Sequence, residues 1–313
     1  MLQHETVLLK PTIDALQVHD GGIYVDATFG RGGHCRYLLQ QAHHLQVLAF
    51  DRDQAAIASG QSLVQQVHQQ TDNSLTLIAR NFTNLKAELS KRQIKQIDGI
   101  CYDLGVSSPQ FDDPQRGFSY RFNARLDMRM DQTQTKDAYQ IVNQWDYKQL
   151  ADILFRYGDE KYAKRIARLI VQQREQQPIV TTFQLVDLIK EAIPAAARRT
   201  GKNPAKRTFQ ALRIAVNDEL QSLQTSLEQA IQLLRPHGLI SVITFQSLED
   251  RIVKQIFRKY AQPDVPRDLP VIPPELQPTL KIITKKPITA DPTELEHNHR
   301  AHSAHLRIAQ KLH

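Results

Sequence analysis

The feature that most constrains the fold is a short apolar segment that runs into a glycine-rich turn. The segment Ile23–Asp26 has the composition of a strand, and Gly30, Gly32 and Gly33 follow it closely. Glycine tolerates positive φ angles and lets the backbone approach a ligand. A helix predicted after the turn would direct its free N–H groups at the same place. We therefore expect a strand–turn–helix unit at a nucleotide-type cofactor site, with tight strand–helix packing as the alternative.

The spacing inside the turn separates the possible cofactors. A dinucleotide fingerprint reads G-x-G-x-x-G, but Cys35 stands where the third glycine would be. Instead, Asp26 precedes Gly30 by four residues, which gives D-x-x-x-G-x-G. This arrangement resembles the first motif of methyltransferases that use S-adenosylmethionine (SAM), a cofactor with no pyrophosphate to bind.

Strand and helix patterns alternate after the turn. Predicted strands cover residues 46–50, 75–79 and 97–104, and predicted helices cover 53–69 and 84–92. This alternation predicts an α/β fold, a Rossmann-like parallel sheet with helices on both faces. Ligands of such sheets bind at the C-terminal strand ends, where Gly30, Asp51, Phe82 and Asp103 fall. We expect Asp51 to accept hydrogen bonds from the ribose hydroxyls and Phe82 to lie against the adenine.

From residue 112 the pattern becomes helical. Predicted helices cover 136–144, 147–155, 160–174 and 182–192. Sheet-type segments return with one long amphipathic helix over 209–234, a strand over 238–245, a helix over 247–260, an irregular proline-rich region over 263–292 and a strand over 304–308. We therefore expect a discontinuous sheet domain, residues 1–111 and 209–313, with an inserted all-helical domain, residues 112–208, as the RNA or substrate recognition part.

Positive charge is concentrated in the inserted region. Residues 112–208 hold 18 Lys and Arg against 12 Asp and Glu, which accounts for six of the seven net charges of the chain. A stretch without acids that begins in this region and runs past it carries six cations, at Arg198, Arg199, Lys202, Lys206, Arg207 and Arg213. Such a stretch predicts contacts with RNA phosphates, and a solvated basic surface is the alternative.

Other classes of site are disfavoured. The two cysteines, Cys35 and Cys101, form no C-x-x-C pair, so we expect neither a disulfide framework nor a thiolate metal site. The histidines near the end of the chain, His297, His299, His302 and His305, fit no standard metal-site spacing, and we expect no metal. No apolar run reaches membrane-spanning length and the first residues lack signal-peptide features, so we expect a cytoplasmic protein that does not bind membranes.

The second candidate site is the loop over residues 103–111. Methyltransferases that act on the amino groups of bases carry a D/N/S-P-P-Y/F loop at this place, and the segment Ser108–Phe111, S-P-Q-F, is similar. An exocyclic amine is a poor nucleophile because its lone pair is delocalised into the ring. Hydrogen-bond acceptors around the NH₂ group can localise that lone pair and aim it at the methyl group. We expect Asp103 and Ser108 to supply acceptors, while a structural turn remains the alternative for Gly105 and Pro109.

Several longer segments resemble the MraW (RsmH) family of ribosomal RNA methyltransferases. The matching segments are His4–Leu8, Asp26–His34, Asp103–Gln110, Arg116–Ser119, Leu126–Met130, Arg207–Ile214 and Ser247–Arg251. The resemblance implies a class I SAM-dependent methyltransferase sheet with an inserted helical domain. It also implies transfer of a methyl group from SAM to N4 of a cytosine in the decoding region of 16S ribosomal RNA, within the small ribosomal subunit. The cofactor contacts that it implies are Gly32, Gly33, His34, Asp51, Phe82, Asp103 and Gln110.

One position departs from the family pattern. The family usually has histidine where this chain has Gln246, and glutamine cannot titrate. A proton-accepting role at this position is therefore in doubt.

Two other function classes compete with a methyltransferase. A nicotinamide oxidoreductase is disfavoured by the missing third glycine, and a non-catalytic RNA-binding factor is disfavoured by the complete set of strand-end residues. Within methyltransferases, no cysteine lies in the substrate loop, so we expect direct attack by the amine rather than covalent thiolate catalysis. The sequence leaves the oligomeric state open.

Overall fold

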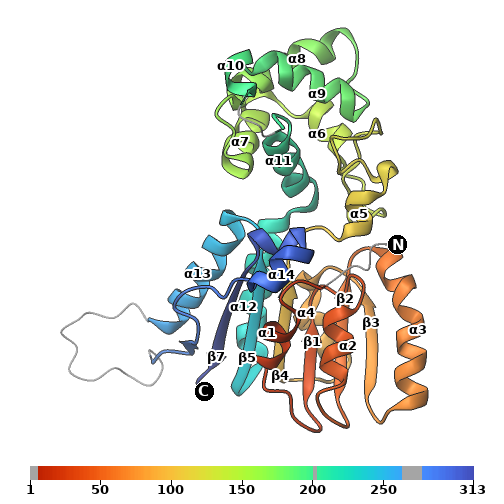
Figure 1. The fold of residues 1–313 in the computed structure, drawn as a ribbon, viewed down its shortest axis with the longest axis vertical. Helices are drawn as coiled ribbons and strands as arrows, with labels where there is room; N and C mark the ends of the chain where they lie inside the picture. Colours follow the sequence, from red (N-terminus) through yellow and green to blue (C-terminus); the bar gives the residue numbers. More distant parts are fainter. Residues whose placement is uncertain (1–5, 200–202, 263–276) are drawn as a thin grey trace, which may run out of the picture. The chain divides into compact units, whose positions relative to one another are not determined.

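The computed structural model describes residues 6–199, 203–262 and 277–313. The chain forms two compact units, Met1–Gly105 with Leu220–His313 and Val106–Glu219. We call them the sheet unit and the helical unit, and we describe each by itself (Figure 1).

The sheet unit is built on seven strands in the order β3-β2-β1-β4-β5-β7-β6. Their bounds are β1 (Ile23–Asp26), β2 (Gln46–Asp51), β3 (Ser74–Ala79), β4 (Ile97–Asp103), β5 (Leu234–Thr244), β6 (Leu280–Ile282) and β7 (His305–Lys311). The first five are parallel, and β7 runs antiparallel to β5 and β6. The predicted α/β, Rossmann-like fold is confirmed.

Helices cover both faces of this sheet (Figure 1). They are α1 (Leu9–Asp14), α2 (Gly33–Leu39), α3 (Gln54–Gln70), α4 (Leu85–Lys91), α12 (Glu219–Leu233), α13 (Ser247–Ala261) and α14 (Pro292–His297). Helices α4, α12 and α13 share one core with Val25 and Leu48, whereas α1, α2 and α3 share another with Tyr24 and Val47. Adjacent strand residues thus serve opposite cores, which explains why the central strands are apolar throughout.

The helical unit has one core. Its helices are α5 (Ser108–Asp112), α6 (Ala138–Gln144), α7 (Tyr147–Gly158), α8 (Ala163–Gln176), α9 (Thr182–Ala192), α10 (Ala195–Arg198) and α11 (Lys206–Asn217). Buried residues Ile141, Leu150, Ile166, Ile189 and Leu212 contribute to that core from α6, α7, α8, α9 and α11. The helices predicted over the insertion are therefore present, with ends that shift by up to three residues.

The single long helix predicted over 209–234 is wrong. Asp218 takes a left-handed conformation, φ 47°, and separates α11 from α12. Leu212 of α11 is buried in the helical core, whereas Leu223 and Leu227 of α12 are buried in the sheet core. The helical unit thus covers Val106–Glu219, whereas the predicted inserted domain covers 112–208, and the packing of α11 accounts for the later C-terminal limit.

The irregular region predicted over 263–292 also needs correction. Residues 280–282 form β6, which pairs with β7, while residues 263–276 lie outside the described part.

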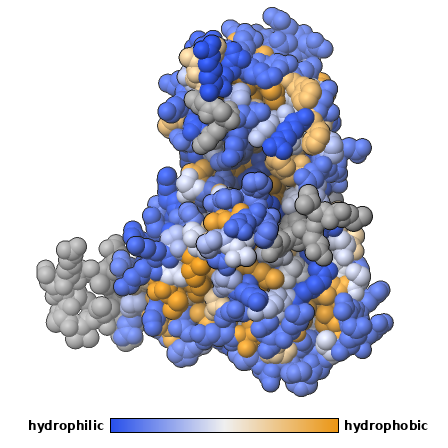
Figure 2. Space-filling view, in the orientation of Figure 1, coloured by the Kyte–Doolittle hydropathy of each residue, from blue (hydrophilic) through white to orange (hydrophobic). Residues whose placement is uncertain are grey.

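Hydrophilic residues cover most of the visible surface, with apolar patches among them (Figure 2). None of the helices in the described ranges is long and apolar enough to cross a membrane.

Candidate functional site

The carboxyl ends of five parallel strands meet at one edge of the sheet. The register pairs Asp51 of β2 with Ala79 of β3, and Asp26 of β1 with Cys101 of β4. Strands β2, β1 and β4 are neighbours, so Asp51, Asp26 and Asp103 end three adjacent strands. The structure therefore brings together the strand-end acids that the sequence singled out, at the edge where parallel sheets bind ligands.

The glycine turn joins β1 to α2 and has packing reasons for its composition. Gly30 and Gly32 have φ angles of 54° and 73°, which glycine adopts without strain. A Cβ atom on Gly32 would come within 2.8 Å of the Phe29 ring, and one on Gly33 would collide with the Thr6 hydroxyl. Close packing thus accounts for glycine at positions 32 and 33, and the predicted cofactor contact of the turn stays a prediction.

Asp51 links the glycine turn to the end of β2. Its Oδ2 atom accepts the Gly30 N–H at 2.8 Å, and its Oδ1 atom accepts the Asp53 N–H at 2.8 Å. Burial raises the pKa of the Asp51 carboxyl to about 6. An ionised carboxylate has about four acceptor positions, so Asp51 keeps acceptors for hydroxyl donors of a ligand.

Asp26 and His34 place further polar atoms beside the turn. Asp26 is buried, and its Oδ1 accepts the Thr28 N–H at 3.0 Å. Burial raises the pKa of the Asp26 carboxyl, and the nearby His34 opposes that shift. Within the described ranges, Asp26 Oδ2 and His34 Nε2 are buried atoms without a hydrogen-bond partner. Buried polar atoms normally have partners, so these two atoms fit a site that binds polar groups of a ligand.

Asp103 lies at the end of β4, with its side chain 25% exposed. The Oδ2 atom is 4.0 Å from Nδ1 of His34, and the backbone N–H donates to Thr28 Oγ1 at 2.7 Å. Thr28 thus ties the end of β4 to the turn after β1. Thr28 was not predicted as a site residue, although it stands inside the D-x-x-x-G-x-G segment.

Phe82 follows β3 in a short 3₁₀ turn, Phe82–Asn84. Its ring meets the buried Tyr102 ring edge-on at 5.8 Å, and the Arg52 guanidinium lies 5.9 Å from its centroid. These contacts restrain the ring beside the strand ends. The predicted adenine contact stays a prediction.

Ser108 and Gln110 belong to the helical unit. Gln110 is 5% exposed, and its Oε1 atom accepts the Ser107 N–H at 3.1 Å as part of a capping box that starts α5. The Gln110 amide therefore has a local structural role. The predicted cofactor contact of Gln110 and the predicted substrate contact of Ser108 stay predictions.

Gln246 lies between β5 and α13, in the sheet unit. Its Nε2 atom donates to Glu249 Oε1 at 2.8 Å, and Glu249 Oε2 accepts the Phe245 N–H at 2.9 Å. Gln246 and the buried Glu249 thus form a capping box at the start of α13. A titrating side chain is not needed for that arrangement.

The two cysteines are inert in character. Cys35 and Cys101 are buried and unpaired, and burial together with the nearby Asp26 raises the pKa of both thiols well above the usual range. A reactive cysteine needs an accessible thiolate.

In the described ranges no group of three His, Cys, Asp or Glu side chains could hold a metal ion.

The predicted phosphate-binding residues differ in their surroundings. Arg199, Lys206 and Arg207 are exposed, and the Arg207 guanidinium donates to the Asp159 carbonyl at 2.8 Å. Arg213 is 18% exposed and binds Glu219 through two hydrogen bonds of 2.8 Å. This pairing leaves Arg213 little surface for a phosphate. Lys202 lies outside the described residues.

Comparison with known proteins gives matches over nearly the whole chain. The model of the MraW methylase family matches residues 1–312. A ribosomal RNA small subunit methyltransferase H from Lactobacillus johnsonii is 58% identical over 312 residues, which is 99% of each chain. A protein of the same name from Lactobacillus delbrueckii subsp. bulgaricus is 58% identical over 311 residues, again 99% of each. Among solved structures, a putative rRNA-methylase from Clostridium thermocellum is 13% identical with a TM-score of 0.45, covering 99% of this chain and 100% of that one.

Proposed function

Because this chain belongs to the MraW methylase family, we propose that it transfers a methyl group from SAM to N4 of a cytosine in 16S ribosomal RNA. The substrate is the decoding region, recognised within the small ribosomal subunit in the cytoplasm. The family match over residues 1–312 is the observation that carries this proposal. The arrangement of the sheet edge supports it independently.

The residues of the sheet edge fit SAM by their chemistry. Asp51 offers acceptors for the ribose hydroxyls, Phe82 offers an apolar ring for the adenine, and Gly32 and Gly33 offer backbone atoms. Asp26 and His34 supply buried polar atoms that lack partners within the described ranges. When bound, SAM supplies an electrophilic methyl group on a positively charged sulfur.

The protein's part in the reaction is to prepare the amine. Acceptors at Asp103 and Ser108 bind the N–H groups of the cytosine amine and so direct its lone pair toward the methyl group. The interaction strengthens as the nitrogen gains positive charge, so it acts mainly on turnover. Cys35 and Cys101 are buried thiols outside the 103–111 loop, so the amine attacks directly, with no covalent bond between enzyme and RNA.

The proposal is tested by methyl transfer from labelled SAM to small subunits that lack the modification. Digestion of the RNA and mass spectrometry of the nucleosides should identify N4-methylcytidine. Methylation at carbon 5 would refute the amine mechanism. Tight SAM binding without any transfer would favour an RNA-binding factor that retains a cofactor site, and binding of NAD in place of SAM would favour an oxidoreductase.

A further inference from the structure

A hollow on the helical unit lies between the end of α7 and the start of α8, and the proposed reaction makes no use of it. Its volume is about 470 Å³, and Phe155, Tyr162 and Arg165 are among the residues that line it. The Phe155 side chain is 65% exposed, the highest value among the large apolar residues of the described ranges that are exposed. One exposed apolar side chain is ordinary on a protein surface. Whether Phe155 belongs to a binding site therefore depends on the charged residues around it.

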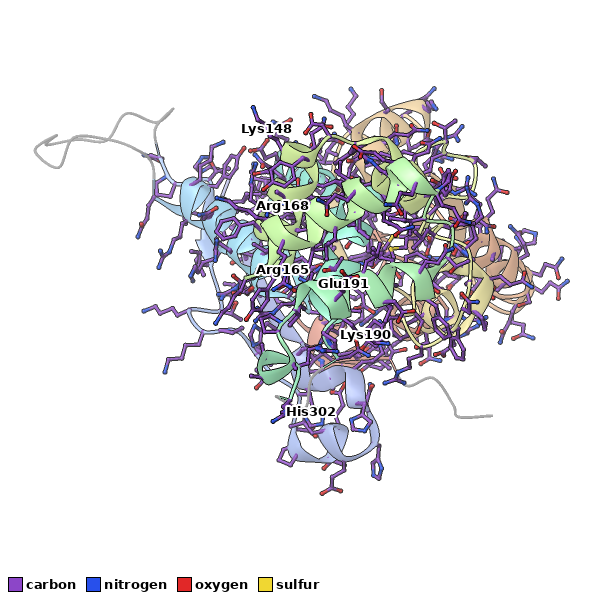
Figure 3. The ribbon with its side chains drawn as sticks, turned by 90° about the horizontal axis from the view of Figure 1, so that it is seen from above. Lys148, Arg165, Arg168, Lys190, Glu191 and His302 are labelled. Atoms are coloured by element: carbon purple, nitrogen blue, oxygen red, sulfur yellow. The ribbon has the colours of Figure 1, made fainter. Side chains whose placement is uncertain are left out.

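Four exposed cations lie at this hollow or beside it. Lys161 lies in the loop before α8, and Lys164, Arg165 and Arg168 lie on α8 itself. On α8, Arg168 follows Lys164 by four residues and Arg165 by three, so these side chains share one face of the helix. Figure 3 shows Arg165 and Arg168 following one another on one side of the helical unit, with Lys148 of α7 beyond them.

Most of these charges are available. Among the described residues, no carboxylate forms an ion pair with Lys161, Lys164 or Arg168. The Arg165 guanidinium donates to the Glu191 carbonyl at 3.3 Å, which holds it over the end of α9.

The two acids that line the hollow are already engaged. Asp152 pairs with Arg156 at 3.3 Å. Glu160 is 3% exposed, and its carboxylate accepts the Tyr162 N–H at 3.0 Å. The residues that line the hollow therefore carry more available positive than negative charge, and Phe155 is exposed among them.

We propose that this hollow binds an unpaired base of the substrate RNA by stacking on Phe155, while Lys161, Lys164 and Arg168 contact the adjoining phosphates. Aromatic rings accept any base by stacking, and cations beside them follow the backbone. A single-stranded segment is required, because bases within a duplex do not offer their faces to a protein ring. The proposal rests on the proposed function in taking RNA as the partner, but it does not depend on methyl transfer.

The test measures binding of the full chain to a short single-stranded RNA that carries 2-aminopurine, a base whose fluorescence falls on stacking. Phe155→Leu keeps the apolar character and removes the ring, Phe155→Tyr keeps the ring, and Phe183→Leu on α9 is the matched control, since Phe183 is 42% exposed. We expect Phe155→Leu to raise the Kd roughly five- to hundredfold and to abolish the fluorescence change. The other two variants should bind as the wild type does.

Two further measurements separate this inference from the proposed function. A Lys161→Gln/Lys164→Gln/Arg168→Gln variant should reduce the salt slope of binding by about two units, at roughly 0.7 for each phosphate of a single strand that is no longer neutralised. SAM affinity and the melting temperature should stay at wild-type values in every variant. Unchanged RNA affinity of Phe155→Leu would overturn the proposal and leave this face to a protein partner. An absence of methyl transfer with RNA binding still dependent on Phe155 would refute the proposed function alone.

Discussion

The raised pKa of Asp51 predicts that SAM binding depends on pH. The carboxyl titrates near pH 6 because it is buried, and hydroxyl donors of a ribose bind its ionised form. At about pH 5 only about a tenth of the carboxyl is ionised, so the Kd for SAM should be roughly tenfold higher than at pH 8. Above about pH 7 the affinity should be constant. Isothermal titration calorimetry across this range measures the effect directly.

Asp51→Asn is the matched variant for this prediction, because its amide cannot titrate. It should weaken SAM binding at pH 8 by roughly ten- to hundredfold, since hydrogen bonds to a charged acceptor contribute about 1.5–3 kcal/mol. The slope of affinity against pH should disappear in the variant. A flat wild-type profile, or equal slopes in the two proteins, would remove Asp51 from the ribose contact.

The Asp51 carboxyl should also make the stability of the fold depend on pH. Stability without SAM should fall as the pH rises, whereas SAM affinity should increase. The pKa in the folded chain lies above the ordinary value of 3.8, so the folded state holds the proton more tightly than the unfolded state does. Its contribution to stability is complete below about pH 4 and is lost as the pH rises through about 6. Without SAM, the wild type should lose stability relative to Asp51→Asn over this interval in chemical denaturation.

Four other variants test the remaining assignments. Ser108→Ala and Asp103→Ala, assayed at saturating SAM, should lower the single-turnover rate more than RNA affinity, because their acceptors act on the attacking amine; a full rate in Ser108→Ala would make that serine structural. A Cys35→Ala/Cys101→Ala variant should keep methyl transfer with a modest loss of stability, and a covalent adduct with 5-fluorocytidine RNA in the wild type would contradict direct attack. A variant in which Arg199, Lys202 and Lys206 of the basic stretch are replaced by glutamine should have a lower salt slope of RNA binding. The slope should fall by roughly one unit for each phosphate that is no longer bound. An unaltered slope would make the stretch a solvated surface.

Local patterns in the sequence were sufficient for the five parallel strands of the sheet unit. Apolar strand segments of four to eight residues with helices between them predict a parallel sheet, because both faces of such strands must be buried. Once the strands are parallel, their carboxyl ends share an edge, and the positions of Asp51 and Asp103 follow without coordinates. The family segments placed His34 and Gln246 in the same way, by position along the chain.

Tertiary structure alone decided where one unit ends and the next begins. The apolar repeat through Leu212, Leu223 and Leu227 reads as one helix, because periodicity reports that a face is buried and not which core buries it. The left-handed Asp218 separates α11 from α12, although an aspartate in a helical pattern gives little warning of it. Side-chain partners were equally hidden. Arg213 lies in a basic stretch yet binds Glu219, because the fold and not charge along the chain decides which carboxylate comes within reach.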